Sequence, residues 1–266
     1  MLKKGKLFLA LLLTCFLLGN TFGSIAVNAA GNSASQAAQT VETMSKANEY
    51  KAFWFSFYDY DSYRAKYKKR TAANFRTYFT GVVKKGKSLG MNRVIVQVRP
   101  FGDAIYKSKY FPWSKYISGK QGRSPGYDPL KIMVDVAHKN GMKIEAWVNP
   151  YRVTIGSTNY SKLSKNNPAR KWHAKKSTSR NVRAYNGSLY YNPSKKDVRN
   201  LIINGAKEIV KNYKVDGIHM DDYFYPEFTS KNVKTAFDAK EYNKSSYKKN
   251  KKSIYTYRRA QVSTLV

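Results

Sequence analysis

The segment Asp216–Pro226, with the sequence DGIHMDDYFYP, has two adjacent carboxylates, an imidazole and two phenols at the end of a short apolar stretch. Adjacent acids that follow a buried strand are unfavourable to fold around, because a carboxylate loses its hydration when it is buried without a partner. Such a cluster is typical of a catalytic site. Asp221 and Asp222 are therefore the first candidates for a catalytic role.

Glycoside hydrolysis is the chemistry that these groups suit. It needs one carboxylic acid to protonate the leaving oxygen and one carboxylate to attack the sugar or to activate water. Asp221 can supply one of the two groups, and Glu145 or Asp222 is the candidate for the other. A partner on a later strand is the alternative, and this chain would then lack it.

Strands and helices are expected to alternate from residue 51 onward. Short apolar or aromatic runs predict strands, and apolar residues at helical spacing predict helices. Asp128-Pro129 and Ser194–Asp197 are helix-start signals. The expected strands are 52–58, 93–99, 143–148 and 215–220, and the expected helices are 71–89, 128–141, 194–213 and 253–266.

This alternation predicts an α/β fold, a parallel sheet with helices packed outside it. The long segments 100–127 and 149–193 leave the carboxyl ends of strands, where (β/α)₈ barrel enzymes build their active sites. An open doubly wound sheet is the alternative, but the sequence has no Gly-rich phosphate loop. A full barrel needs about 250 residues. We therefore predict a TIM-barrel type with only about the first four β/α units, a truncated product or gene fragment.

Strand parity predicts which side chains face the barrel axis, because residues i and i+2 share one face of a strand. One parity of each strand is polar towards its carboxyl end, and the other parity is apolar and should face the helices. This places Asp221, and not Asp222, inward beside His219. The alternatives are a satisfied core histidine at 219 and a buried ion pair of Glu145 with Arg99. The inward set is Trp54, Ser56, Tyr58, Gln97, Arg99, Glu145, Trp147, Asn149, His219 and Asp221.

Further residues are expected to bind the sugar. His219 and Arg99 would donate hydrogen bonds to hydroxyl groups or keep Asp221 ionised. Exposed aromatic rings on the long loops would stack on the apolar faces of sugar rings. These rings are Tyr106, Trp113, Tyr151, Tyr223 and Tyr225.

The N-terminal residues predict export. Lys3, Lys4 and Lys6 precede an apolar run at 7–18 and a small-residue cleavage pattern at 27–29, so residues 1–29 are predicted to be a cleaved signal peptide. An uncleaved membrane anchor is the alternative. Residues 30–49 are predicted to be a linker, and residues 50–266 the barrel. Cys15 lies in the leader, so the mature chain would have no thiol, disulfide or cysteine metal site.

The chain is strongly basic, with a net charge of +33 that falls to about +30 without the leader lysines. For an exported, wall-associated protein the expected anionic partners are wall polymers, with lipid head groups as the alternative. Nucleic acid is disfavoured because the sequence has no recognition module. A solvated basic surface is the alternative to any of these partners.

Five motifs in order carry a resemblance to a known family. They are QVRPFGDAIY at 97–106, YFPWS at 110–114, YDPL at 127–130, AWVNPYR at 146–152 and DGIHMDDYFYP at 216–226. Together they resemble glycosyl hydrolase-like family ten, whose members are exported bacterial barrel proteins. The resemblance implies a (β/α)₈ glycosidase that acts on cell-wall glycan, with an acid of the last motif as catalytic residue. Asp103 and Arg152, from two of these motifs, join the expected substrate-binding residues.

Two other function classes are weighed against a glycosidase of peptidoglycan-like substrates. A non-catalytic wall-binding module would use a basic, aromatic-rich surface to hold polymers without cleaving them. A metal-dependent deacetylase would need clustered His and Asp ligands, but His138, His173 and His219 are far apart in the sequence. No metal or cofactor is expected.

Overall fold

The computed structural model describes residues 49–221 and 224–265. The chain divides into two units, Met1–Tyr50 and Lys51–Val266, and every described element belongs to the second. The signal peptide and all but the last residue of the linker lie outside the described residues, so both stay predictions. No helix in the described part is long and apolar enough to cross a membrane.

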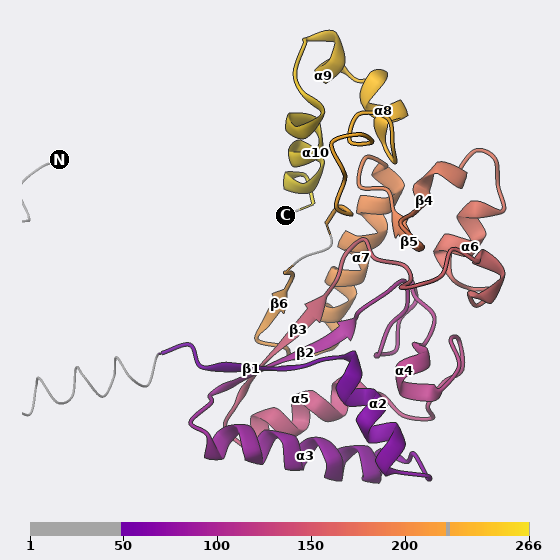
Figure 1. Ribbon diagram of the computed structural model, residues 1–266. Helices are drawn as coiled ribbons and strands as arrows, with labels where there is room; N and C mark the ends of the chain where they lie inside the picture. The colour runs from indigo at the N-terminus through magenta and orange to yellow at the C-terminus, as the bar shows by residue number, and fades with distance from the viewer. Residues whose placement is uncertain (1–48, 222–223, 266) are drawn as a thin grey trace, which may run out of the picture. The chain divides into compact units, whose positions relative to one another are not determined.

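Four parallel strands form the central sheet (Figure 1). Each strand pairs in parallel with its neighbour, which confirms the predicted α/β fold and the sequence order of its strands. In sheet order they are β1 (Ala52–Phe55), β2 (Arg93–Arg99), β3 (Lys143–Val148) and β6 (Gly217–His219).

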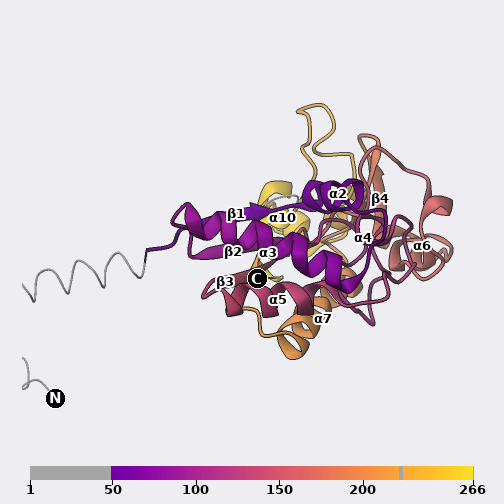
Figure 2. The same cartoon turned by 90° about the horizontal axis from the view of Figure 1, so that it is seen from below.

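Three long helices connect these strands: α3 (Ala72–Ser88), α5 (Pro129–Lys139) and α7 (Lys196–Asn212). Figure 2 shows α3 and α5 side by side across the sheet, with α7 beyond α5. Asp128 caps α5 by accepting a backbone N–H group, as predicted, and Thr71 caps α3 in the same way. The predicted capping box at Ser194 is wrong. The N-cap position of α7 is Lys195, which makes no side-chain cap hydrogen bond, and the Ser194 hydroxyl donates to Asp238 at 3.0 Å instead.

The first strand is shorter than predicted. Ser56 begins a helix, α2 (Phe57–Lys66), and Asp59 Oδ2 accepts hydrogen bonds from the Ser56 backbone N–H at 2.7 Å and hydroxyl at 3.0 Å. This Ser-x-x-Asp cap overrides the aromatic run that suggested a strand over 52–58. Tyr58 therefore lies on α2 and not on the inner face of a strand, with 67% of its surface exposed.

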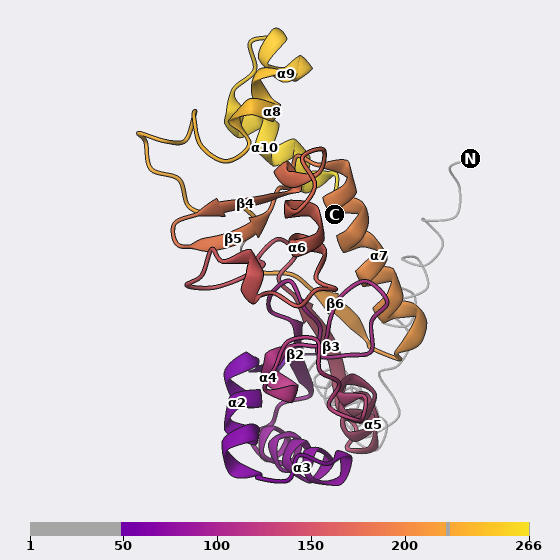
Figure 3. The same ribbon diagram turned by 90° about the vertical axis from the view of Figure 1, so that its right-hand side faces the viewer.

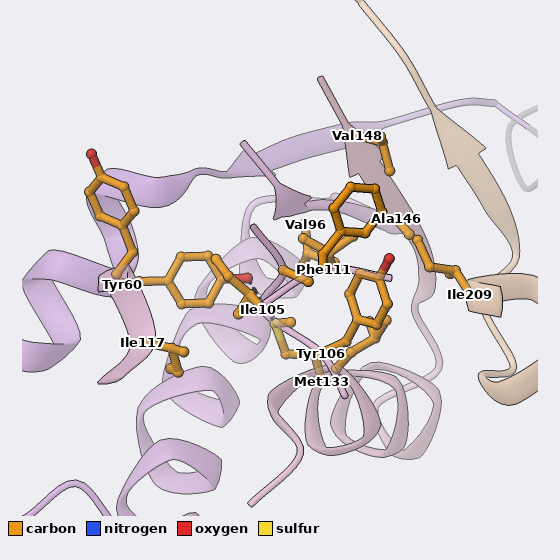
Figure 4. Close-up of a cluster of buried hydrophobic side chains, with 14 of the residues drawn as sticks. Tyr60, Val96, Ile105, Tyr106, Phe111, Ile117, Met133, Ala146, Val148 and Ile209 are labelled. Atoms are coloured by element: carbon orange, nitrogen blue, oxygen red, sulfur yellow. Dashed lines mark hydrogen bonds between the residues drawn. The ribbon is translucent and has the colours of Figure 1, made fainter. Parts of the chain in front are cut away.

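The hydrophobic core lies between the sheet and the helices (Figure 4). The apolar parity of β2 and β3 points into it, as predicted. Figure 4 shows Val96, Ala146 and Val148 gathered with Met133 of α5 and Ile209 of α7. The fully buried strand residues of this parity are Phe55, Val94, Val96, Val98, Ile144 and Ala146.

The long connections carry small elements of their own. The segment after β2 contains α4 (Lys115–Ser118), and the segment after β3 contains α6 (Pro168–His173) with the antiparallel hairpin β4 (Val182–Tyr185) and β5 (Ser188–Tyr191). Figure 1 shows α6 and this hairpin at the end of the sheet to which the β2 and β3 arrows point.

The chain after β6 forms α8 (Ala239–Asn243), α9 (Ser246–Lys249) and α10 (Ile254–Ser263). Figure 3 shows these three helices grouped beyond one end of α7, at the opposite end of the view from α3. A buried ion pair between Asp238 and Arg258 holds α10 to the segment before α8, with a distance of 2.7 Å.

Candidate active site

Asp221 lies two residues beyond the end of β6 and is held by two side chains of the neighbouring β3 segment. Its Oδ1 atom accepts hydrogen bonds from Trp147 Nε1 at 2.7 Å and from Asn149 Nδ2 at 3.0 Å. Trp147 and Asn149 share one parity, so both reach the same face of the sheet. Asp221 itself is exposed. The arrangement fixes a carboxylate in one orientation while leaving it accessible.

A chain of hydrogen bonds behind Asp221 sets the orientation of the Asn149 amide. Gln97 Nε2 donates to Asn149 Oδ1, and the backbone N–H of Phe57 donates to Gln97 Oε1 at 3.0 Å. Because the Asn149 oxygen accepts from Gln97, its NH₂ group faces Asp221. Gln97 and Asn149 are 3% and 2% exposed, so both position the carboxylate and neither presents a surface to a substrate.

Trp54, Trp147 and His219 form an aromatic wall beside this carboxylate. The Trp54 ring lies 4.6 Å from Trp147 and 4.8 Å from His219, edge to face in both cases. Trp54 is 48% exposed. A partly exposed wall of this kind suits the apolar face of a sugar ring. The inward parity predicted for Trp54, Trp147, His219 and Asp221 therefore brings these four side chains together.

Glu145 lies one inward position below Trp147 and pairs with a different arginine from the one expected. Arg93 Nη1 contacts Glu145 Oε1 at 2.7 Å, and His219 Nδ1 lies 3.7 Å from Glu145 Oε2. The strand register places Glu145 opposite Gly217, where an added Cβ would approach the Glu145 Cγ to 3.2 Å. Glu145 thus balances the charge of Arg93 beneath His219. Its predicted catalytic role stays a prediction.

His219 is not the satisfied core histidine that was the alternative. Its Nε2 atom is buried and has no hydrogen-bond partner within the described residues. A buried ring nitrogen without a partner is unfavourable unless a ligand or water completes it. One nitrogen of His219 is therefore unsatisfied within the described residues. Asp222 and Tyr223 lie outside the described residues, and their roles stay predictions.

The prediction that Arg99 shares the inner face with Gln97 is wrong. Pairing with β3 shifts between these residues, so that Gln97 lies opposite Trp147 and Arg99 opposite Val148. This irregularity turns Arg99 into the core, where it is 1% exposed and stacks 4.6 Å over the Phe111 ring. It donates to the carbonyl oxygens of Asn149 and Pro150. Arg99 holds the loop after β3 in place.

Two loop tyrosines predicted to be exposed are core residues. Tyr106 is 1% exposed and Tyr151 has no exposed surface, so neither can stack on a sugar. Tyr225 is also partly buried, and its hydroxyl donates to Asp238. Trp113 is partly buried against the core, and the Arg152 guanidinium lies 5.4 Å from the Phe101 ring. The side chains of Trp113 and Arg152 are therefore each partly exposed on the loops.

Asp103, from the loop after β2, lies apart from this cluster in its own hydrogen-bond network. It is 2% exposed, and its Oδ2 atom accepts from Gln121 Nε2 at 2.7 Å. Burial raises the pKa of Asp103 to about 6, against the opposing effects of Gln121, Ser114 and Lys115. No group of three or more His, Cys, Asp or Glu suited to a metal occurs in the described ranges.

Replacing Trp147 by Phe tests the hydrogen bond to Asp221. Phe keeps the ring but removes the Nε1 donor, so the carboxylate loses one of its two fixed partners. We expect kcat to fall about 10-fold to 100-fold, because the loss acts through the orientation of the carboxylate, while any change in KM reports the smaller ring in the aromatic wall. Steady-state kinetics on a soluble glycan fragment measures both constants. A rise in KM at constant kcat would contradict the positioning role.

Replacing Asp103 by Asn tests the burial of this carboxyl group. The folded pKa of about 6 lies above the unfolded value of 3.8, so stability falls as pH rises between these values. Above that window the wild type is destabilised by roughly 2 to 3 kcal/mol, which Asn escapes. Urea unfolding measures the free energy of unfolding, which should fall less between pH 4 and pH 7 for the variant than for the wild type. An unchanged difference between the two pH values would refute the expectation.

The family described as Glycosyl hydrolase-like 10 matches residues 50–266. The chain belongs to this family. The match includes β1, β2, β3 and β6 and the segment that carries Asp221, and the resemblance inferred from the five motifs is confirmed.

Curated relatives carry the same kind of name. Glycosyl hydrolase YngK of Bacillus subtilis (strain 168) is 41% identical over 184 residues, which cover 68% of this chain and 34% of the relative. Glycosyl hydrolase DigH of Escherichia coli (strain K12) is 40% identical over 141 residues, which cover 52% of this chain and 32% of DigH. The chain spans about a third of the length of these relatives.

Solved structures show only distant similarity. The α-L-fucosidase isoenzyme 2 from Paenibacillus thiaminolyticus is 12% identical with a TM-score of 0.47, and covers 82% of this chain and 29% of its own. An α-amylase from Geobacillus thermoleovorans is 15% identical with a TM-score of 0.38, covering 55% of this chain and 33% of its own. The family assignment rests on the sequence match.

Proposed function

We propose that the protein hydrolyses glycosidic bonds of a peptidoglycan-like cell-wall glycan, with Asp221 as a catalytic carboxylate. The observation that carries the proposal is the fixed, exposed Asp221, held through Oδ1 by Trp147 and Asn149. Two donors on one oxygen suit a group that acts in its ionised form, as nucleophile or as the base that activates water. Family membership supports the reaction class.

The sugar would lie against the aromatic wall of Trp54, Trp147 and His219. The exposed part of Trp54 offers an apolar surface to a pyranose ring, and His219 Nε2 offers a polar contact to a hydroxyl group. Gln97 and Asn149 act through Asp221 and not on the substrate. The wall residues would therefore contact the sugar, and Gln97 and Asn149 would orient the carboxylate.

Secretion and association with the cell wall complete the proposal. The predicted leader supports export, and the net charge of about +30 without the leader supports attraction to anionic wall polymers. Attraction of this kind weakens with salt, because exposed charges are screened within about 10 Å at 0.1 M ionic strength. Binding to purified walls should therefore decrease between low and high salt.

A release assay on purified peptidoglycan tests the proposal. The purified protein is incubated with the glycan, new reducing ends are counted in the supernatant, and bound protein is measured in the pellet. Hydrolysis predicts new reducing ends that increase with time and protein concentration. Binding without release would instead support a wall-binding module, which the exposed Trp54 and the basic surface also suit.

A further inference from the structure

A cavity lies between the loop after β2 and the loop after β3. Its volume is about 150 Å³, which suits one ring-sized group and is smaller than the usual pocket for a whole ligand. Phe101, Val153 and Leu163 contribute apolar walls, and Asp103, Gln121 and two lysines contribute polar groups. Val153 lies four residues beyond Asn149, so the cavity belongs to the same loop that leaves the candidate active site.

Asp103 lines this cavity, and one of its carboxylate oxygens has no hydrogen-bond partner within the described residues. Its Oδ1 atom is buried and accepts no hydrogen bond within the described residues, while Oδ2 is bound by Gln121. Leaving a buried carboxylate oxygen without a donor is unfavourable, because the lost hydration is not replaced. A ligand that brings a hydroxyl or amide N–H group would supply the missing donor.

Hydrogen bonds between the two loops fix the side chains that line the cavity. Gln121 Oε1 accepts from the Ser164 backbone N–H at 2.8 Å and from Asn167 Nδ2 at 3.3 Å, which fixes the Gln121 NH₂ group towards Asp103. Asn167 also donates to the Gly102 carbonyl oxygen at 2.9 Å. Gln121 thus links Asp103 to the loop after β3.

Two exposed lysines add positive charge to the same cavity. Lys115 and Lys162 belong to its lining from the two opposite loops, and both have exposed side chains. A cationic ligand group would pair with Asp103 but would be repelled by the lysines. A neutral donor for Asp103 combined with an anionic substituent for the lysines satisfies both kinds of group.

We infer that this cavity binds a single pyranose unit that carries a carboxylate, as a subsite for the glycan. A ring hydroxyl or amide N–H donates to Asp103 Oδ1, and the carboxylate lies towards Lys115 and Lys162. The inference rests on the proposed function for its place in a glycan chain. It adds the class of sugar, an acidic one, at a position separate from Asp221.

Binding of matched monosaccharides to the purified protein tests the inference. Glucuronic acid and glucose differ by a ring carboxylate, and N-acetylmuramic acid and N-acetylglucosamine differ by a lactyl carboxylate. The two pairs distinguish the sources of the acid group. NMR titration at low salt should give at least one acidic sugar an affinity about 5-fold higher than that of its neutral partner, the size expected of exposed charge pairs.

The variant Lys115→Gln/Lys162→Gln should abolish this preference. The control Lys120→Gln/Lys165→Gln makes the same change in net charge on exposed lysines of the same two loops outside the cavity, and should keep it. Asp103→Asn should weaken the neutral and the acidic sugar alike, because Gln121 would retain the amide oxygen and leave an NH₂ group in place of the acceptor.

Equal affinity for the acidic and neutral sugars, or an equal loss of preference in both lysine variants, would overturn the inference. Absence of binding to every sugar would do so as well. Sugar release from peptidoglycan without monosaccharide binding would remove this subsite and leave the proposed function intact. Lysine-dependent binding of the acidic sugar without release from peptidoglycan would support the subsite and refute the proposed hydrolase activity.

Discussion

Asp221→Asn is expected to lower the rate of sugar release by at least about 1,000-fold, because asparagine neither attacks a sugar nor activates water as a carboxylate does. The amide fits the same space, and the variant should stay folded since Asp221 is exposed. Binding to insoluble glycan should change far less than release. Reducing-end release and pelleting with the same glycan measure both quantities.

Asp216→Asn is the matched control on the same segment. Asp216 precedes β6 and accepts from the Ile144 backbone N–H at 2.9 Å and contacts His138 Nε2 at 2.9 Å, so its role is structural. The His138 and Ile144 hydrogen bonds lower the pKa of Asp216 despite the opposing effect of burial. Below its unfolding temperature this variant should keep kcat. Equal loss in both variants would mean that the segment, and not the Asp221 carboxylate, matters.

Asp238→Asn is expected to produce the largest loss of stability. Asp238 has no exposed side-chain surface, and its Oδ1 accepts from Arg258 while its Oδ2 accepts from Ser194 and Tyr225. Removing the charge leaves Arg258 buried without its counterion, which typically costs about 3 to 5 kcal/mol. Urea unfolding at pH 7 measures the change in the free energy of unfolding.

Asp135→Asn is the control, since Asp135 and Arg76 form an exposed pair at 3.6 Å. Its effect should stay below about 1 kcal/mol. Adding Arg258→Met to Asp238→Asn should recover part of the lost stability, because no unpaired charge then remains buried. A loss of the same size in the Asp135 control would contradict the assignment.

The order of the strands and the composition of the inner face could be predicted from the sequence. Val94, Val96 and Val98 share one parity of β2, and this period places them against the helices whatever the surrounding loops do. Parallel pairing then aligns the carboxyl ends of the strands. For this reason Trp147, Asn149 and Asp221 meet in space although 74 residues separate the first from the last.

Other features were present in the sequence as local signals that competed with stronger patterns. Ser56 and Asp59 form a helix cap inside an aromatic run that looks like a strand. Asn186-Gly187 joins β4 and β5, with φ of 42° and 70° at the two residues, as expected for a tight hairpin. Arg93 has the same strand parity as Gln97, so its place on the inner face, where it pairs with Glu145, could also be predicted.

The misplaced residues depend on tertiary contacts that no short pattern encodes. The shift in pairing after Gln97 turns Arg99 into the core, and strand alternation cannot reveal it. Tyr106 and Tyr151 lie in loops, but the helices and loops that cover them come from distant parts of the chain. The Gln121 hydrogen bond to Asp103 likewise depends on how two long loops pack.

Hydrolysis in water enriched with ¹⁸O tests whether the protein cleaves the glycan with water and whether this cleavage needs the Asp221 carboxylate. Cleavage by water places its oxygen at the anomeric carbon of each new reducing end, and mass spectrometry of the released fragments detects one label per cleavage. A preformed reducing sugar kept in the same water corrects for spontaneous exchange. We expect labelled ends from the wild type and almost none from Asp221→Asn. Equal labelling by both proteins, or unlabelled fragments, would contradict it.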